Sequence, residues 1–378
     1  MFREKVSKLK AKGLFRATLG IDSCHGPLVR AQGREMINFA SNNYLGLAGH
    51  TKVVEAVVSA VREYGWGSGA SRLMSGSNHL HEELEQRLAA FKGTEAALLF
   101  NSGYMANLGV IPVLAEDGIT IFSDELNHAS IIDGVKLANV EVKIYRHCDA
   151  AHLNELMTAT PGAKMIVTDG VFSMDGDIAP LDKIRNLARK HDAVLYVDDA
   201  HGVGVLGKHG RGAGELYKLD ITKDVIIGTL SKAFGGVGAY VAGNRALIDY
   251  LRSRARTFIF TTALPPPACA ATLAALDIIE NDGAALRKTL ADLSNRLAAG
   301  LAKLNIPADA ATPIFPVMTG DVKNTRRISS RVEVRGILAP AIRPPTVAPD
   351  ACRLRVSITA AHTPEQIDHL LAALAEVF

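Results

Sequence analysis

The chain lacks the features that mark secreted, zinc-binding and membrane proteins. Its cysteines are scattered, with no CxxC pair, at Cys24, Cys148, Cys269 and Cys352. This spacing predicts neither a disulfide framework nor a metal site. No stretch reaches the roughly 18 uninterrupted apolar residues of a membrane span, and the basic N-terminus lacks the apolar core of a signal peptide. We therefore expect a protein of the reducing cytoplasm that has no membrane partner.

An excess of one charge is absent as well. The formal net charge is +3, which is too small to indicate a nucleic-acid partner. The 378 residues are 48% hydrophobic and 21% charged, and they contain no evident internal repeat. This length and composition are typical of a compact enzyme with about two structural units.

Short apolar runs alternate with helical patterns between residues 96 and 243. The expected strands are Ala96–Phe100, Ile119–Phe122, Val142–Tyr145, Met165–Asp169, Ala193–Asp198, Val225–Thr229 and Gly238–Gly243. This alternation predicts an α/β fold in which helices wrap a mostly parallel sheet.

The pattern changes near residue 280. Long Ala/Leu-rich helices follow, with strand-like runs at 314–318 and 353–358 and a closing helix from Pro364. We predict three parts, which are an N-terminal arm (residues 1–50), a large domain (51–280) and a smaller α+β C-terminal domain (281–378).

A single lysine, Lys232, follows an apolar run at 224–227 and lies among the small residues of segment 228–236. A strand-end amine of this kind suits a Schiff-base lysine, because glycine and serine leave room for a flat cofactor against the backbone. The alternative is a solvated lysine in a Gly-rich turn.

The segment 193–202 decides between these interpretations. Unbroken apolar residues lead to Asp198, and His201 follows three residues later. Ligand-facing groups of open α/β sheets lie at this end of a strand, and a carboxylate there can keep the ring nitrogen of pyridoxal phosphate (PLP) protonated. Asp198 alone would equally suit a helix N-cap or a metal ligand. Its combination with Lys232 favours PLP.

Two glycine-rich segments imitate a dinucleotide-binding motif. Residues 202–207 match G-x-G-x-x-G after a strand, but a Gly-rich loop follows where a helix should hold a pyrophosphate. Residues 65–70 match the looser G-x-G-x-x-A form, but a helical pattern over residues 51–64 precedes them. We interpret both segments as loops.

The turn at residues 101–107 is a candidate phosphate site. Ser102, Gly103 and Tyr104 lie between a strand end and a helical stretch. The N-terminus of a helix presents unpaired N–H groups to an anion. The alternative is an ordinary helix cap.

Five ordered stretches, at residues 38–47, 67–73, 168–177, 197–202 and 341–347, resemble the α-oxoamine synthase family of PLP-dependent enzymes. The resemblance covers nearly the whole chain. It implies fold type I, a pyridoxal 5′-phosphate cofactor and an obligate homodimer with active sites between the subunits. Two departures, Asp169 where Glu is common and Asn43 where Asp is common, are expected to lie away from the core roles.

The resemblance also implies the catalytic residues. Lys232 would bind PLP and move the α-proton of the amino acid. His128 would stack on the cofactor ring and polarise the thioester carbonyl, and a helix-capping histidine is the alternative for this residue.

Further cofactor contacts follow from the same resemblance. The phosphate would be held by the turn at 102–104 and by Thr229, with Thr261 or Thr262 reaching it from the partner subunit. Ser173 and His201 would lie near the phenolic oxygen of the cofactor, or one step behind it.

The substrate carboxylate would be bound by Arg355, with Arg353 in a structural role, although residues two apart on a strand share a face. Arg343 would brace the loop at 341–347. The remaining substrate contacts that the resemblance implies are Arg16, Asn42 and Thr346.

The implied reaction is a decarboxylative condensation of an amino acid with an acyl thioester. Segments 71–73 and 341–347 most resemble the branch that joins L-alanine to a pimeloyl thioester in biotin biosynthesis. Sister enzymes make 2-amino-3-ketobutyrate from glycine, 5-aminolaevulinate or 3-ketosphinganine.

Two other classes stay open, an aminotransferase of the same fold and a scaffold protein without catalysis. An aminotransferase would share Lys232 and Asp198 but would have no acyl-thioester pocket. A basic cluster, Arg252, Arg254 and Arg256, could meet coenzyme A or an acyl carrier protein, or could be a solvated face.

Overall fold

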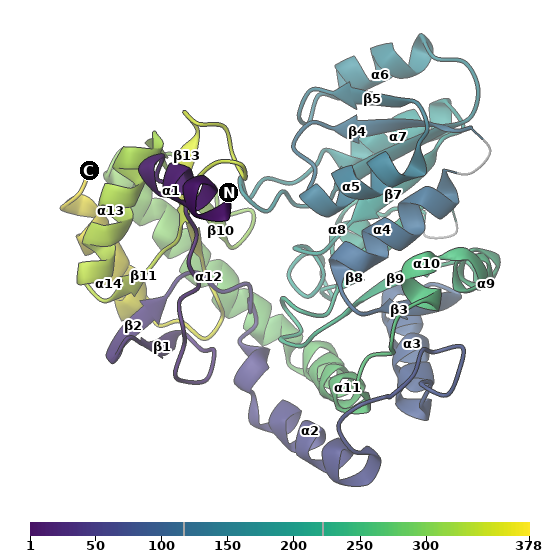
Figure 1. Cartoon of the computed structure of the whole chain (residues 1–378), viewed down its shortest axis with the longest axis horizontal. Helices are drawn as coiled ribbons and strands as arrows, with labels where there is room; N and C mark the ends of the chain where they lie inside the picture. The colour runs from purple at the N-terminus through teal and green to yellow at the C-terminus, as the bar shows by residue number, and fades with distance from the viewer. Residues whose placement is uncertain (116–117, 221–222) are drawn as a thin grey trace. The chain divides into compact units, whose positions relative to one another are not determined.

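The computed structural model describes residues 1–115, 118–220 and 223–378. The chain divides into two compact units, each considered by itself below. The first comprises Met1–Gly49, Met174–Gly176 and Leu286–Phe378, and the second comprises His50–Ser173 and Asp177–Ala285. In Figure 1 the second unit contains the large sheet, drawn in blue and teal.

The second unit is built on a seven-stranded sheet with the order β3-β9-β8-β7-β6-β4-β5. Its strands are β3 (Ala96–Phe100), β4 (Thr120–Asp124), β5 (Val142–Tyr145), β6 (Lys164–Asp169), β7 (Val194–Asp198), β8 (Val225–Thr229) and β9 (Ala239–Gly243). Strands β5, β4, β6, β7 and β8 are parallel. The predicted mostly parallel α/β fold is therefore confirmed.

The strand β9 runs antiparallel to both of its neighbours, β8 and β3. Only the loop at residues 230–238 joins β8 to β9, and a parallel return needs a longer crossover connection. The parallel strands are instead separated by helices, which are α4 (Gly103–Leu114), α5 (Ala129–Ala138), α6 (Ala150–Thr158), α7 (Leu181–Lys190) and the short α8 (Ala213–Leu216).

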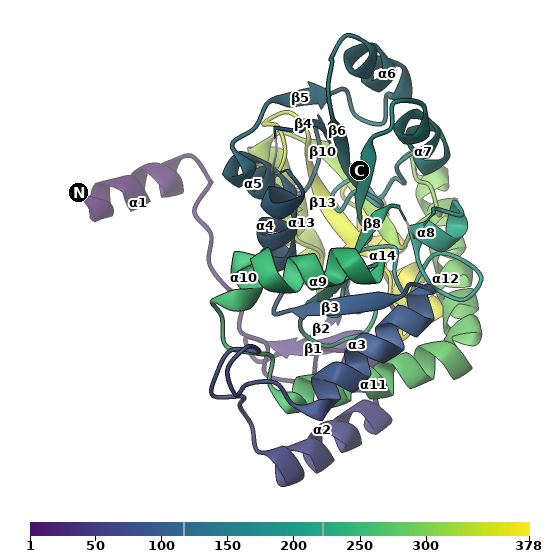
Figure 2. The ribbon, with the colours of Figure 1, turned by 90° about the vertical axis from the view of Figure 1, so that its right-hand side faces the viewer.

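The core of this unit lies on the sheet. Strands β3, β4, β6, β8 and β9 are buried along their whole length, as expected for strands covered on both faces. The remaining helices of the unit are α2 (Thr51–Tyr64), α3 (His79–Lys92), α9 (Arg245–Arg254), α10 (Arg256–Ile259) and α11 (Pro266–Asn281). Helix α2 packs along α11 (Figure 2).

The first unit has two small sheets, in the orders β10-β13-β12 and β1-β2-β11. Their strands are β1 (Leu28–Ala31), β2 (Arg34–Asn38), β10 (Ile314–Gly320), β11 (Ile337–Leu338), β12 (Ala341–Ile342) and β13 (Cys352–Ser357). The helices are α1 (Phe2–Ala11), the 3-10 turn η1 (Leu47–Gly49), α13 (Val322–Val334) and α14 (Pro364–Ala375), with most of α12 (Gly283–Lys303).

The parallel register of the large sheet aligns three strand ends. Asp169 at the end of β6 lies opposite Asp198 at the end of β7, and Asp198 lies opposite Ile227 of β8. Because parallel strands end at the same edge, the residues that follow β8 reach the same place. This edge carries the candidate site.

A glycine in β8 lies against a buried ring of the neighbouring strand β9. Gly228 pairs with Tyr240 of β9, and a Cβ at Gly228 would overlap the fully buried Tyr240 ring. We expect Gly228→Ala to cost about 1–3 kcal/mol, as overpacking in a core does, and to lower the melting temperature measured by circular dichroism. Gly20→Ala, where no atom lies within 4 Å of the new Cβ, is the control. Equal melting temperatures for the two variants would contradict this account.

Candidate active site

A cavity of about 210 Å³ lies at this edge of the sheet in the second unit. It brings together most of the predicted cofactor residues. Its lining is Ser102, Gly103, Tyr104, His128, Ser130, Asp169, Asp198, Ala200, His201, Thr229, Ser231 and Lys232. Three other residues that were predicted to contact the cofactor, Ser173, Thr261 and Thr262, are not among the described residues that line this cavity.

The N-terminus of α4 forms one wall of the cavity. Ser102 is the N-cap, and its hydroxyl accepts a hydrogen bond from the Met105 N–H at 3.2 Å. Thr229 lies nearby, since a Cβ on Gly103 would come within 3.9 Å of its Oγ1. A helix N-terminus beside two hydroxyl groups is suited to a phosphate.

Tyr104 points its hydroxyl at Asp133 with a short hydrogen bond. This bond is the main cause of the raised pKa of Tyr104. The sequence placed Tyr104 at the phosphate turn, and its backbone lies there, but its phenol is engaged by the neighbouring helix α5.

Asp198 is almost completely buried and is held through both carboxylate oxygens. Oδ1 accepts a hydrogen bond from the Ala200 N–H at 3.0 Å, and Oδ2 accepts one from Asn107 Nδ2 at 2.7 Å. The sequence prediction assigned no role to Asn107. Its place in an otherwise apolar helical run, after the Ser-Gly turn, was the available signal.

Asp169 lines the same cavity, so the expectation that it lies away from the core roles is wrong. Its Oδ2 accepts the backbone N–H of His128 at 2.7 Å. Burial raises the pKa of Asp169 well above its ordinary value, and the nearby Asp198 raises it further. Asn43, the other departure, accepts the Ala48 N–H within the first unit.

His128 is the N-cap of α5, which is the alternative that the sequence left open. Its Nδ1 accepts the Ser130 N–H at 3.2 Å and lies 2.7 Å from the Ser130 hydroxyl. Burial lowers the pKa of His128, the charge of Asp198 raises it, and that of Lys232 lowers it. The ring also lines the cavity, and its stacking on a cofactor stays a prediction.

Lys232 is half-buried in the loop that follows β8 and faces the cavity with Asp198 and His128. Its charge acts on the pKa values of both His128 and Asp169. The alternative of a lysine in open solvent does not fit this position. His201 is buried in the same lining, three residues after Asp198.

Two glycines of the segment at 202–212 are explained by their packing against Asp199. A Cβ at Gly202 or Gly212 would collide with the carboxylate of Asp199. That carboxylate accepts the Ala213 N–H and pairs with Lys92 at 3.4 Å, deep in the unit. Burial raises the pKa of Asp199 to about 6. Of the three glycines of the dinucleotide-like motif, Gly202 thus makes room for a buried ion pair.

Three predicted cofactor residues lie elsewhere in the second unit. Thr261 Oγ1 and the Thr262 carbonyl oxygen both accept hydrogen bonds from Asn101 Nδ2, at 3.4 and 2.7 Å. Ser173 lies in the loop that follows β6. The proposed reach of Thr261 or Thr262 into a partner's site stays a prediction.

The four predicted substrate residues belong to the first unit and form two pairs. Arg355 donates to Asn42 Oδ1 at 3.0 Å and to the hydroxyls of Ser357 and Tyr44 at 2.8 and 3.3 Å. Arg16 donates to Thr346 Oγ1 at 3.2 Å. Each pair therefore joins two predicted substrate residues that are more than 300 positions apart in sequence.

The other two arginines of this region have backbone and carboxylate partners. Arg353 forms an ion pair with Asp175 and donates to the carbonyl of Ala351 at 3.0 Å. Arg343 donates to the Phe15 carbonyl at 2.7 Å. These contacts are those of structural residues.

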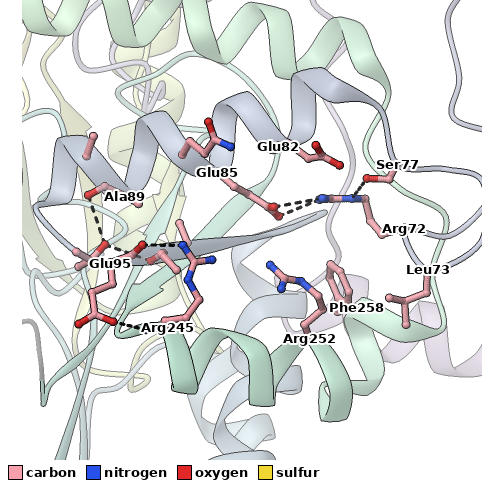
Figure 3. A pocket seen from close by; sticks show the side chains of 15 residues that line it. Arg72, Leu73, Ser77, Glu82, Glu85, Ala89, Glu95, Arg245, Arg252 and Phe258 are labelled. Carbon is pink, nitrogen blue, oxygen red and sulfur yellow. Dashed lines mark hydrogen bonds and ion pairs between the residues drawn. The ribbon is translucent and has the colours of Figure 1, made fainter.

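A second cavity, of about 720 Å³, lies beside α3, β3 and α9 (Figure 3). Arg72 crosses it and binds both carboxylate oxygens of Glu85, at 2.9 and 3.2 Å. Glu85 also accepts the Leu99 N–H. Arg72 therefore ties the segment at 71–73 to α3 and β3, and this larger cavity contains none of the predicted catalytic side chains.

A charged cluster that the sequence did not predict lies near the ends of β4 and β6. His147 contacts Asp124 through Nδ1 at 2.9 Å and Asp177 through Nε2 at 2.8 Å. Burial lowers the pKa of His147, but the two carboxylates outweigh it and raise that pKa to about 12. Asp124, His147 and Cys148 are close enough to share a metal ion, but a ligand histidine must first lose its proton.

The lining of the smaller cavity fits pyridoxal phosphate. It offers a helix N-terminus and hydroxyls for a phosphate, the buried Asp198 carboxylate for a ring nitrogen, and the Lys232 amine for the aldehyde carbon. We find no helix among the described residues that is long and apolar enough to cross a membrane.

The family model for class I and II aminotransferases matches residues 34–374. An 8-amino-7-oxononanoate synthase from Geotalea daltonii is 47% identical over 381 residues, which cover 100% of this chain and 97% of that protein. Another from Anaeromyxobacter dehalogenans is 49% identical over 375 residues, covering 99% of this chain and 94% of that protein.

Two solved structures extend the comparison. A serine palmitoyltransferase from S. paucimobilis, with bound PLP-myriocin aldimine, has a TM-score of 0.94 and 32% identity, covering 100% of this chain and 96% of that chain. An 8-amino-7-oxononanoate synthase from Francisella tularensis has a TM-score of 0.78 and 31% identity, covering 90% and 97%.

The His147 cluster predicts a pH-dependent contribution to stability. Its folded-state pKa, about 12, exceeds the unfolded value of roughly 6.5. The stabilisation is therefore complete below the unfolded pKa and is lost as pH rises toward the folded one. We expect His147→Asn to lower the melting temperature most near pH 6.5 and progressively less up to pH 10. A gap that is constant with pH, or the same trend in the exposed control His25→Asn, would argue against the charged cluster.

Proposed function

The chain belongs to the aminotransferase class I and II family, and within it we propose the activity of an 8-amino-7-oxononanoate synthase. The protein is a PLP-dependent acyltransferase. It condenses L-alanine with a pimeloyl thioester and releases 8-amino-7-oxononanoate, CO2 and the free thiol, as a step of biotin biosynthesis. Coenzyme A or an acyl carrier protein carries the acyl group.

One observation carries this assignment. Several bacterial relatives with this name are 45–49% identical to the chain along its length. The solved synthase from Francisella tularensis, at 31%, is about as similar in sequence as the serine palmitoyltransferase, at 32%. The higher TM-score of that enzyme, 0.94 against 0.78, concerns the backbone, which sister enzymes share. It makes a serine- or glycine-dependent synthase the second candidate.

The chain's own residues supply the proton chemistry. When bound, PLP provides an electron sink for reactions at the α-carbon of an amino acid. Lys232 would hold the cofactor through its Nζ, and the same amine could remove and return the α-proton of the amino acid. Asp198 would hold the ring nitrogen in its protonated form, because its carboxylate is fixed by Asn107 and Ala200.

His128 suits the polarisation of the thioester carbonyl. Its pKa is lowered, chiefly by burial, which favours the neutral ring. Since Nδ1 accepts the Ser130 N–H, the proton is assigned to Nε2, which can donate to an oxygen that gains negative charge in the transition state.

Substrate binding is proposed for the two pairs of the first unit. The guanidinium of Arg355 offers a bidentate site for the amino acid carboxylate, and Asn42 and Tyr44 hold its orientation. Arg16 and Thr346, which contact each other, are proposed to contact the bound substrates.

A homodimer completes the proposal. Thr261 or Thr262 of one subunit would reach the phosphate in the other, and the arginines at 252, 254 and 256 would face an acyl carrier protein or coenzyme A. We place the reaction in the cytoplasm, where the four unpaired cysteines would stay reduced. Nucleic acid and membrane are not proposed partners.

The amino acid selectivity is tested by absorbance spectroscopy. We expect purified protein loaded with PLP to show a visible cofactor band that L-alanine changes at lower concentration than glycine or L-serine. Pimeloyl thioester should then release thiol. Selectivity for glycine or serine would favour a sister synthase, amino-group transfer without thiol release would favour an aminotransferase, and a band as intense in Lys232→Ala would refute the lysine assignment.

The intersubunit site is tested by mixing inactive variants. Lys232→Ala and the double variant Thr261→Ala/Thr262→Ala should each be impaired, because they lack the lysine and the phosphate hydroxyls. Random mixing of subunits restores about one quarter of the sites to wild type if the threonines act across a two-fold interface. No recovery after verified exchange, or a fully active monomer by light scattering, would contradict the proposal.

A further inference from the structure

The buried side-chain amide of Asn107 is hydrogen-bonded to Asp198 directly and to His128 through Ser130. Asn107 lies on α4 and has no exposed surface. Its Nδ2 donates to Asp198 Oδ2 at 2.7 Å and to Ser130 Oγ at 2.8 Å. Its Oδ1 accepts the hydroxyl of Tyr196 at 2.5 Å. Every hydrogen-bonding atom of this side chain therefore has a partner.

The orientation of the amide follows from its partners. An ionised carboxylate only accepts hydrogen bonds, so the nitrogen of Asn107 must face Asp198. The oxygen then faces Tyr196, whose hydroxyl is a donor. An exchange of the two amide atoms would place an oxygen against the Asp198 carboxylate, which is strongly unfavourable in a buried site.

The network continues from Asn107 to His128. Ser130 Oγ accepts the Asn107 amide, so its own hydrogen is free to point at His128 Nδ1, 2.7 Å away. The Ser130 N–H donates to the same nitrogen. A ring nitrogen that faces two donors carries no proton in the neutral imidazole. The proton of His128 is therefore on Nε2.

We propose that Asn107 is a positioning residue that fixes the Asp198 carboxylate and, through Ser130, the tautomer of His128. This inference rests on the proposed function. One amide thus holds the acceptor for the cofactor's ring nitrogen and keeps Nε2–H of His128 available as a donor. Both groups are set by α4, the helix whose N-terminus is the proposed phosphate site.

A merely structural role for Asn107 makes a different prediction. If the amide only satisfied the Tyr196 hydroxyl inside the core, its loss would lower stability without altering protonation at either functional group. Spectroscopic measurements of protonation at the cofactor ring nitrogen and at His128 can therefore distinguish the positioning role from the structural role. Melting temperature alone cannot.

The decisive variant is Asn107→Leu, which has a similar volume and no polar atoms. Tyr196→Phe is the matched control, because it removes the hydrogen bond to Oδ1 and leaves both Nδ2 bonds. Ser130→Ala interrupts only the branch to His128. Asn107→Ser, which is too short to bridge Asp198 and Ser130, replaces Asn107→Leu if the leucine variant does not fold.

Two nitrogen-15 NMR measurements provide the readouts. In protein loaded with PLP labelled at the ring nitrogen, Asn107→Leu should move the ring nitrogen signal toward its unprotonated position, and Ser130→Ala should not. In cofactor-free protein with labelled histidine, both variants should raise the fraction of His128 that is protonated at Nδ1. The hydroxyl at 2.7 Å is lost or no longer oriented by Asn107, and only the longer backbone N–H contact at 3.2 Å still holds that nitrogen. The His128 signals are identified by their loss in His128→Asn. Tyr196→Phe should leave both readouts near wild type.

Steady-state kinetics add a third readout. We expect Asn107→Leu to lower kcat by roughly 10- to 100-fold, the range for residues that orient a functional group, with a smaller change in KM for the amino acid. A protonated ring nitrogen and an unchanged His128 tautomer in Asn107→Leu would overturn the inference. The NMR readouts do not depend on which amino acid is the substrate, so failure of the proposed function would be recognised separately.

Discussion

The buried carboxylate of Asp198 is the group on which the arrangement of the site depends. Removing a carboxylate from water without partners costs several kcal/mol or more, so the fold must supply donors at the end of β7. The Ala200 N–H and the Asn107 amide do so. Since Asn107 is on α4, the same requirement fixes α4 against the sheet and places the helix N-terminus beside Thr229. The proposed contact with the ring nitrogen and the proposed phosphate site therefore both depend on the position of α4.

A second carboxyl group beside Asp198 adds to this constraint. Asp169 is buried next to it, and its raised pKa means that the pair need not hold two negative charges. Its hydrogen bond with the His128 N–H positions the start of α5. The pKa values of Asp169 and of His128 both depend on the charges of Asp198 and Lys232, so the protonation of Asp169 and that of His128 are linked.

The ion pairs around the site stabilise loops and have no role in the proposed reaction. Asp199 and Lys92 hold the loop that follows β7, and Arg72 and Glu85 hold the segment after α2. His147 fixes the ends of β4 and of the loop that carries Ser173, through Asp124 and Asp177. The residues of each pair belong to different elements or loops and are at least 13 positions apart in sequence. The functional residues can therefore lie on loops and still keep defined positions.

The strands of the large sheet, and the positions of Lys232, Asp198 and the turn at 102–104 beside them, could be predicted from periodicity, glycines and strand ends, because these are local signals. The sequence could not assign Asn107, Asp169 or His147, whose roles depend on groups brought close only by folding. The sequence also left two roles open for His128, a helix cap and a cofactor contact. In the structure His128 both caps α5 and lines the cavity. Tertiary structure alone decides which buried polar groups are partners, because hydrogen bonds and pKa values depend on distances between segments that the linear pattern does not contain.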